Sequence, residues 1–149
     1  RIHRYEIKVK FLGKPDYLTE RIKKTLNDLE ETTKDYSNHF LNIAIAYGGR
    51  TEILDGVKKI VEEVNTGELN VDEIGLKTIE KHLYTSHLPN PEPDLIIRTS
   101  GEARLSGFLL WQGAYSELVF MDVYWPDFRK IDLMRAIRTY QNRLRRFGQ

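Results

Sequence analysis

The chain has 149 residues, a net charge of +1, and a composition that is 40% hydrophobic and 30% charged. These values predict one packed domain over residues 1–149 and exclude collagen-like, low-complexity and wholly disordered chains. The sequence contains no cysteine, which excludes disulfides, iron–sulfur clusters and cysteine-ligated zinc and favours a reducing compartment such as the cytoplasm.

The N-terminal part of the chain predicts a strand followed by a helix. Residues 5–12 alternate apolar and polar side chains, as a half-buried strand does, and Gly13-Lys14-Pro15 then ends the pattern. Asp16 is a suitable N-cap for the amphipathic pattern that follows and reaches about Tyr36. This order of elements is typical of the start of an α/β unit.

A second strand and two more helices are predicted before a proline-rich connector. Residues 40–47 form a nearly unbroken apolar run, which predicts a strand buried on both faces, as in a parallel sheet. The helical pattern after Gly48-Gly49 is closed near Gly67. A further helix is predicted within residues 71–84, and the prolines of residues 89–93 cannot continue it.

The C-terminal part repeats the alternation. Residues 94–98 and 118–123 predict short buried strands, residues 108–115 a short helix, and residues 131–147 a final amphipathic helix. Strands that alternate with helices predict an α/β fold with a mostly parallel β-sheet flanked by helices. In such folds the ligand site lies beyond the carboxyl ends of the strands.

The segment Arg98–Ser106 (RTSGEARLS) follows one of these predicted strands and is suited to phosphate. Arg98 and Arg104 each offer a planar fork of N–H donors, Ser106 offers a hydroxyl, and Gly101 allows close backbone approach. The residues alone leave a second interpretation open, in which the segment is an ordinary surface turn whose arginines pair with Glu102.

Glu117 stands just before the next predicted strand and could face the same site. Near a diphosphate, a carboxylate in this place could hold Mg²⁺, which prefers one or two carboxylates together with phosphate oxygens and water. The alternative is an ordinary acid at the edge of a strand.

The remaining motifs point less clearly to chemistry. Tyr47-Gly48-Gly49-Arg50 precedes a helix and could assist anion binding, but the two glycines are better explained by a sharp turn. The histidines lack the spacing of a familiar metal site and receive no catalytic role: His3, His39, His82 and His87.

Basic side chains outnumber the single acid, Asp132, within residues 129–149. Nucleic acid binding is not favoured, because these arginines and lysines surround an amphipathic helix and cations near a helix C-terminus are stabilising anyway. A solvated helix face, or an arm that reaches a diphosphate, is the better interpretation.

Three segments together resemble the cis-prenyltransferase family, the undecaprenyl and dehydrodolichyl diphosphate synthases. They are NIAIAYGGRTEI (42–53), DLIIRTSGEARLSGFLLWQGAYSEL (94–118) and DVYWPDF (122–128). The resemblance extends in order over essentially the whole chain, including the terminal RRFG. It implies a cis-prenyltransferase-like α/β fold and an enzyme that joins isopentenyl diphosphate to an allylic, farnesyl-like diphosphate, with Mg²⁺, to give a long polyprenyl diphosphate.

The resemblance also implies roles for particular residues. Arg98, Arg104, Leu105 and Ser106 match the ligands of isopentenyl diphosphate, and Glu117 matches the carboxylate that helps to hold Mg²⁺. Family members of this kind are homodimers, in which an R-x-G tail reaches the isopentenyl site of the neighbouring subunit. Arg146 and Gly148 match that tail.

The same resemblance implies that the chain corresponds to the C-terminal portion of the family domain. The family's H-x-x-x-D-G-N-x-R segment, with its essential aspartate, has no counterpart in residues 1–149. No catalytic residue is therefore assigned within this chain, and the chain alone is expected to be inactive. A non-catalytic partner subunit of a heteromeric cis-prenyltransferase is the alternative, although such a subunit would not need Arg98, Arg104 and Glu117.

Two departures from the bacterial pattern bear on the product. Ala46 stands where many bacterial members have asparagine, and Ser100 stands where they have glycine. These residues look more like archaeal or eukaryotic members, which leaves both undecaprenyl- and dolichyl-type products open. A long polyprenyl product implies work near a membrane surface.

Overall fold

A computed structural model of the chain describes residues 1–143. The chain divides into two compact units, Arg1–Pro89 and Asn90–Gln149. Each unit contains a pair of parallel strands with helices, so the expected α/β class is confirmed. The single domain over residues 1–149 stays a prediction. None of the helices within residues 1–143 has the length and apolar character needed to cross a bilayer.

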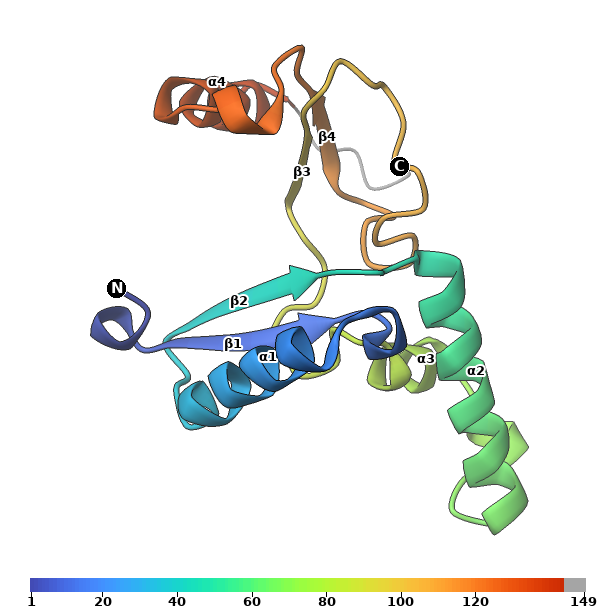
Figure 1. The fold of residues 1–149 in the computed structure, drawn as a ribbon. Coiled ribbons are helices and arrows are strands. Elements are labelled where there is room, and N and C mark those ends of the chain that lie inside the picture. Colours follow the sequence, from blue (N-terminus) through green and yellow to red (C-terminus); the bar gives the residue numbers. More distant parts are fainter. Residues whose placement is uncertain (144–149) are drawn as a thin grey trace. The chain divides into compact units, whose positions relative to one another are not determined.

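The sheet of the first unit is formed by two parallel strands, β1 (Ile7–Leu12) and β2 (His39–Ala44). Val9 lies opposite Leu41 in this register. The crossover between the strands contains helix α1 (Glu20–Thr33), which runs alongside β1 (Figure 1). This is the strand, helix, strand order that the sequence predicts.

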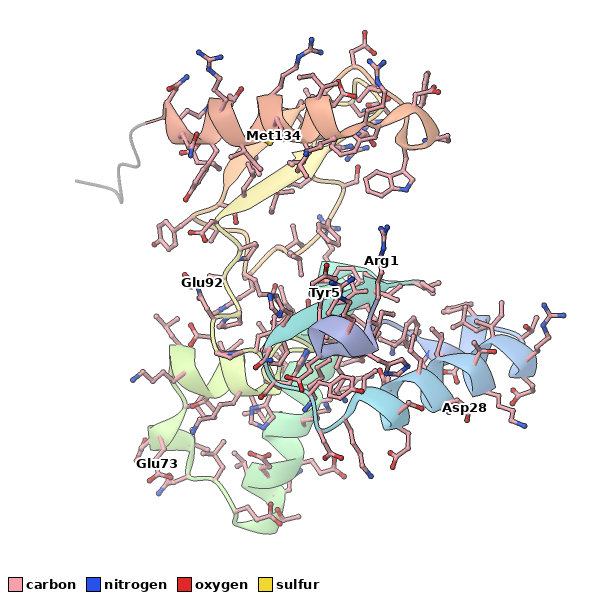
Figure 2. The ribbon with its side chains drawn as sticks, turned by 90° about the vertical axis from the view of Figure 1, so that its left-hand side faces the viewer. Arg1, Tyr5, Asp28, Glu73, Glu92 and Met134 are labelled. Carbon is pink, nitrogen blue, oxygen red and sulfur yellow. The ribbon has the colours of Figure 1, made fainter. Side chains whose placement is uncertain are left out.

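Helix α1 begins later than the sequence predicts. Asp16 does not cap it, because Pro15–Tyr17 forms a separate single 3-10 turn and Thr19 takes the N-cap position. The helix also ends at Thr33 rather than near Tyr36. Asp28 lies on the solvent-facing side of the helix (Figure 2).

Side chains of α1 bind the outer edge of β1. The backbone N–H of Val9 donates to Thr33 Oγ1 at 3.1 Å, and the N–H of Phe11 donates to the carboxylate of Glu30. Thr33 is fully buried and in turn donates to the carbonyl of Leu29 at 2.9 Å. Two N–H groups that point away from β2 therefore have side-chain acceptors.

Strand β2 is not buried on both faces, which corrects the prediction made from its apolar run. Leu41 is 42% exposed, and within residues 1–143 the strand pairs only with β1. The strand also ends at Ala44 rather than at residue 47, because Ala46 takes the left-handed conformation (φ 49°) and turns the chain.

Two helices complete the first unit. Helix α2 (Gly49–Thr66) ends at Gly67, which has a φ of 77° and caps the helix as predicted. Helix α3 (Leu76–His82) is shorter than expected, because a 3-10 turn at Val71–Glu73 precedes it; Glu73 is labelled in Figure 2. A side chain at Gly56 would lie 3.3 Å from the His82 carbonyl oxygen, so α2 and α3 pack closely.

We expect the contact between α2 and α3 to make stability depend on pH. The carbonyl of Thr78 and the carboxylate of Glu63, 2.8 Å from Nε2, raise the pKa of His82. The protonated form therefore stabilises the fold below the unfolded-state pKa of about 6.5, and this contribution is lost as pH rises through the higher folded-state pKa. The free energy of unfolding, measured by urea titration between about pH 6 and pH 8, should fall less in His82→Gln than in the wild type. Equal pH dependence in both proteins would contradict this prediction.

The second unit contains β3 (Leu95–Arg98), β4 (Glu117–Phe120) and α4 (Lys130–Gln141). The two strands are parallel and run side by side (Figure 1), and α4 contacts β4. Glu92 lies in the segment that leads into β3, and Met134 lies on α4 (Figure 2). Both strands are close to the predicted ranges, while α4 ends earlier than predicted and residues 144–147 lie outside the described part of the chain.

The predicted helix over residues 108–115 does not form. This segment consists of turns, and Leu109 within it has a φ of 45°, which a right-handed helix cannot contain. The N–H of Gly113 donates to the Leu109 carbonyl at 2.7 Å. The apolar side chains of residues 108–115 therefore extend from a series of turns and do not line one face of a helix.

Candidate functional site

The loop that follows β3 is tied to the segment that follows β4. The N–H of Met121 donates to the Arg98 carbonyl at 2.8 Å, and the N–H of Gly101 donates to the Met121 carbonyl at 3.0 Å. The N–H of Ser100 donates to the Val123 carbonyl at 2.8 Å. Backbone hydrogen bonds thus fix the start of the Arg98–Ser106 loop at the carboxyl ends of the two strands.

Glycine is required at position 101 for two reasons. Its φ of 71° lies in the left-handed region, and a Cβ atom there would lie 3.0 Å from Asp122 Oδ1. The preceding residue, Ser100, has a φ of 78°. The loop therefore turns sharply as it leaves β3, which returns its second half toward Arg98.

Arg98 closes the loop on itself. Its Nη1 donates to Ser106 Oγ at 2.8 Å and to the backbone carbonyl of Arg104. Leu105, between these residues, is half-buried, and its carbonyl accepts from the N–H of Phe108 at 3.1 Å. The structure therefore places Ser106 and the backbone of Arg104 at the Arg98 side chain, while a phosphate site shared by the two guanidinium groups stays a prediction.

Arg104 pairs with Glu102. Arg104 Nη1 lies 2.8 Å from Glu102 Oε2, and the arginine side chain is 67% exposed. An exposed ion pair of this kind contributes about 0–1 kcal/mol, so another anion could replace Glu102 at little cost. The surface ion pair and the anion-binding interpretation of the sequence are thus compatible.

Glu117 is not brought into contact with this loop. It pairs with Leu95 at the amino end of β3, whereas Arg98 pairs with Phe120. The strands rise about 3.3 Å per residue, so roughly 10 Å of strand separates Glu117 from the loop. Its carboxylate instead accepts a hydrogen bond from Arg143 Nη1 at 3.1 Å. A site shared by Glu117 and the arginine loop stays a prediction.

The donor set at Glu117 suits a hard cation. Arg143 Nη1 donates both to Glu117 Oε2 and to the Leu118 carbonyl, at 3.1 and 2.6 Å, so two oxygens converge on one positive group. Mg²⁺ binds such oxygens and takes further ligands from phosphate and water. Over residues 1–143 there is no group of three or more acidic or histidine side chains that could hold a metal unaided. Within the described residues Glu117 would need further ligands to hold a magnesium ion, and its metal role stays a prediction.

Sequence reasoning missed a buried carboxylate in the first unit. Glu52, in the first turn of α2, is 1% exposed. Its carboxylate accepts a hydrogen bond from the Tyr47 hydroxyl and another, at 2.8 Å, from the N–H of Tyr84. The position of Glu52 in the first turn of a helix was the only sequence signal for a special role. This signal does not predict burial, because the helix dipole also favours acidic residues in the first turn of exposed helices.

A second carboxylate extends this network to the surface. Asp55 accepts hydrogen bonds from the Tyr84 hydroxyl and from Lys14 Nζ, the latter at 3.2 Å. The bond from Tyr84 lowers the pKa of Asp55, and burial raises the pKa of Tyr84. The network borders a cavity of about 540 Å³, which Lys14, Tyr47 and Thr51 help to line. The turn at residues 47–50 is thereby held by side chains as well as by its glycines.

The remaining predicted site residues, Arg146 and Gly148, lie outside the described residues. Their place relative to the loop and to Glu117 stays a prediction.

Comparison with known proteins gives consistent matches. The family model described as "Putative undecaprenyl diphosphate synthase" matches residues 1–148. A relative from Methanocaldococcus jannaschii, named tritrans,polycis-undecaprenyl-diphosphate synthase (geranylgeranyl-diphosphate specific), is 55% identical over 99% of this chain and 53% of its own length. A relative of the same name from Methanopyrus kandleri is 54% identical over 100% of this chain and 54% of its own length. The chain thus spans about half the length of the curated relatives it matches.

Solved structures match as well. The lavandulyl diphosphate synthase of Lavandula x intermedia, crystallised with dimethylallyl diphosphate, is 36% identical with a TM-score of 0.92. The match covers 96% of this chain and 61% of that one. A "probable undecaprenyl diphosphate synthase" from Campylobacter jejuni is 30% identical with a TM-score of 0.82, over 100% of this chain and 66% of that one.

Proposed function

The chain belongs to the undecaprenyl diphosphate synthase family of cis-prenyltransferases, and from this we propose that its protein catalyses cis-prenyl chain elongation. In this reaction the C–O bond of an allylic diphosphate breaks and diphosphate leaves. A C–C bond forms to isopentenyl diphosphate, which loses a proton to give a new cis double bond. The observation that supports this function most directly is the loop at the ends of two parallel strands in which the Arg98 side chain donates to Ser106 Oγ and to the Arg104 carbonyl.

We propose that this loop binds isopentenyl diphosphate. Arg98 and Arg104 would hold the phosphate oxygens with charge-assisted hydrogen bonds, and Ser106 and the backbone at Leu105 would complete the contacts. Arg104 is able to exchange its exposed partner Glu102 for a phosphate group. Binding at this loop would position the alkene of isopentenyl diphosphate for attack on the allylic carbon.

We propose that Glu117 helps to hold Mg²⁺. When bound, this ion would stabilise the negative charge that develops on the leaving diphosphate. The Glu117 side chain is 22% exposed, and its ion pair with Arg143 gives the carboxylate a defined orientation at the start of β4. Since Glu117 lies apart from the loop of its own subunit, a homodimer in which Arg146 and Gly148 also reach a neighbouring site is part of the proposal.

The relatives also bear on primer and product. The relatives from Methanocaldococcus jannaschii and Methanopyrus kandleri are both named as undecaprenyl-diphosphate synthases that are specific for geranylgeranyl diphosphate. We therefore propose geranylgeranyl diphosphate as the primer, in place of the farnesyl-like primer expected from the sequence, and an undecaprenyl-type product. A product of that length would be released at a membrane surface.

The test is a prenyl-transfer assay on the intact protein with radiolabelled isopentenyl diphosphate and Mg²⁺. We expect incorporation with geranylgeranyl diphosphate at a higher kcat/KM than with farnesyl diphosphate, and cis geometry at each added double bond by NMR. Removal of Mg²⁺ with EDTA should abolish incorporation. Trans double bonds, or no incorporation with either primer, would overturn the proposed function.

A further inference from the structure

Glu102 holds the guanidinium of Arg104 within the loop that follows β3. Arg104 Nη1 lies 2.8 Å from Glu102 Oε2, and the two side chains are 67% and 42% exposed. The backbone just before Glu102 is fixed, because the N–H of Gly101 donates to the Met121 carbonyl at 3.0 Å. The carboxylate of Glu102 therefore stays beside the loop when the Arg104 side chain turns toward another anion.

The charge of Glu102 opposes any anion that binds Arg104. An incoming phosphate group has to displace the carboxylate from the guanidinium, and the displaced carboxylate then lies near the phosphate as a like charge. An exposed ion pair contributes little to stability, so this exchange of partners runs in both directions at little cost. Glu102 therefore weakens the binding of phosphate groups to the loop without preventing it.

Chain elongation requires a site that releases its phosphate group. The leaving diphosphate comes from the allylic substrate, so the elongated product keeps the diphosphate that entered as isopentenyl diphosphate. If the loop binds that diphosphate, as proposed above, the loop must release it before each further addition. A carboxylate that takes back the guanidinium of Arg104 would make this release faster.

We propose that Glu102 is a competing anion that returns Arg104 to its ion pair and so promotes release of the product's diphosphate from the loop after each addition. The inference rests on the proposed function of this loop as the site of isopentenyl diphosphate. It adds a residue whose charge opposes substrate binding and favours the next cycle. Removing that charge should strengthen binding, whereas the loss of a purely structural contact would weaken it.

Binding without turnover tests this role. Isopentenyl diphosphate, titrated calorimetrically into the intact protein without primer, should bind on the order of tenfold tighter to Glu102→Gln than to the wild type at low ionic strength. Glu102→Asp keeps the charge and should bind as weakly as the wild type does. Glu92→Gln is the matched control, because it removes the same charge from an exposed side chain at the opposite end of β3, and it should leave the affinity unchanged.

The time course of elongation supplies a second readout. In a rapid-quench experiment with radiolabelled isopentenyl diphosphate, Glu102→Gln should slow the second and later additions more than the first, because only these require the product's diphosphate to leave the loop. The KM for isopentenyl diphosphate and kcat should then both fall. An affinity of Glu102→Gln that is equal to or weaker than that of the wild type, or equal slowing of all additions, would overturn the inference.

Arg104→Gln separates the failure of this inference from the failure of the proposed site. If Arg104→Gln weakens the binding of isopentenyl diphosphate while Glu102→Gln does not strengthen it, only the role of Glu102 fails. If Arg104→Gln leaves the binding unchanged, the proposal that this loop binds isopentenyl diphosphate fails as well.

Discussion

Replacing Arg98 with alanine should lower kcat/KM for isopentenyl diphosphate about a hundredfold. Hydrogen bonds from a charged donor contribute about 1.5–3 kcal/mol each, and one tenfold change corresponds to about 1.4 kcal/mol. The substitution removes the proposed phosphate contact and also the bonds from Arg98 to Ser106 and to the Arg104 carbonyl. Steady-state kinetics with varied isopentenyl diphosphate and saturating primer measure the effect.

Three further variants separate substrate binding from loop geometry. Arg98→Lys keeps the charge without the planar fork and should recover only part of the activity. Ser106→Ala removes one acceptor of Arg98 and should have a smaller effect than Arg98→Ala. Arg129→Ala removes an exposed arginine elsewhere in the same unit and should change little. Unchanged kinetics in both Arg98→Ala and Arg104→Ala would contradict the proposal that this loop binds isopentenyl diphosphate.

Replacing Glu52 with alanine should lower the free energy of unfolding by about 2–4 kcal/mol. The side chain is 1% exposed, and its loss leaves the hydroxyl of Tyr47 and the N–H of Tyr84 without this acceptor in a buried place. Glu52→Gln keeps an acceptor oxygen and should cost less. Urea denaturation followed by circular dichroism measures the difference.

The matched control for this effect is Glu62→Ala. Glu62 lies on the same helix and is exposed, so its loss should change stability by no more than about 0.5 kcal/mol. Similar losses in Glu52→Ala and Glu62→Ala would show that the buried network does not hold the first unit together.

Local patterns in the sequence were sufficient for much of the fold. The alternation that predicts β1 and the glycine that ends α2 at Gly67 are both properties of neighbouring residues. The loop from Arg98 to Ser106 could likewise be predicted, since its arginines and hydroxyl lie close together in the chain. In these places local propensity and the final structure agree.

The remaining features depend on contacts between distant residues or on backbone angles. Apolar spacing predicted a helix over residues 108–115, but a hydrophobic pattern does not reveal a positive φ value such as that of Leu109. The bond between Glu117 and Arg143 joins residues far apart in the sequence, and the burial of Glu52 requires Tyr84 to return to α2. None of these contacts has a local signal.

The side chains of Thr33 and Glu30 that bind the outer edge of β1 also determine how this sheet can grow. A strand from another molecule pairs with a sheet edge through the free N–H groups of that edge. The N–H groups of Val9 and Phe11 already donate to Thr33 and Glu30. Edge-to-edge association, the first step of many β-aggregates, is therefore obstructed on that side. Any strand that widens the sheet must join along β2.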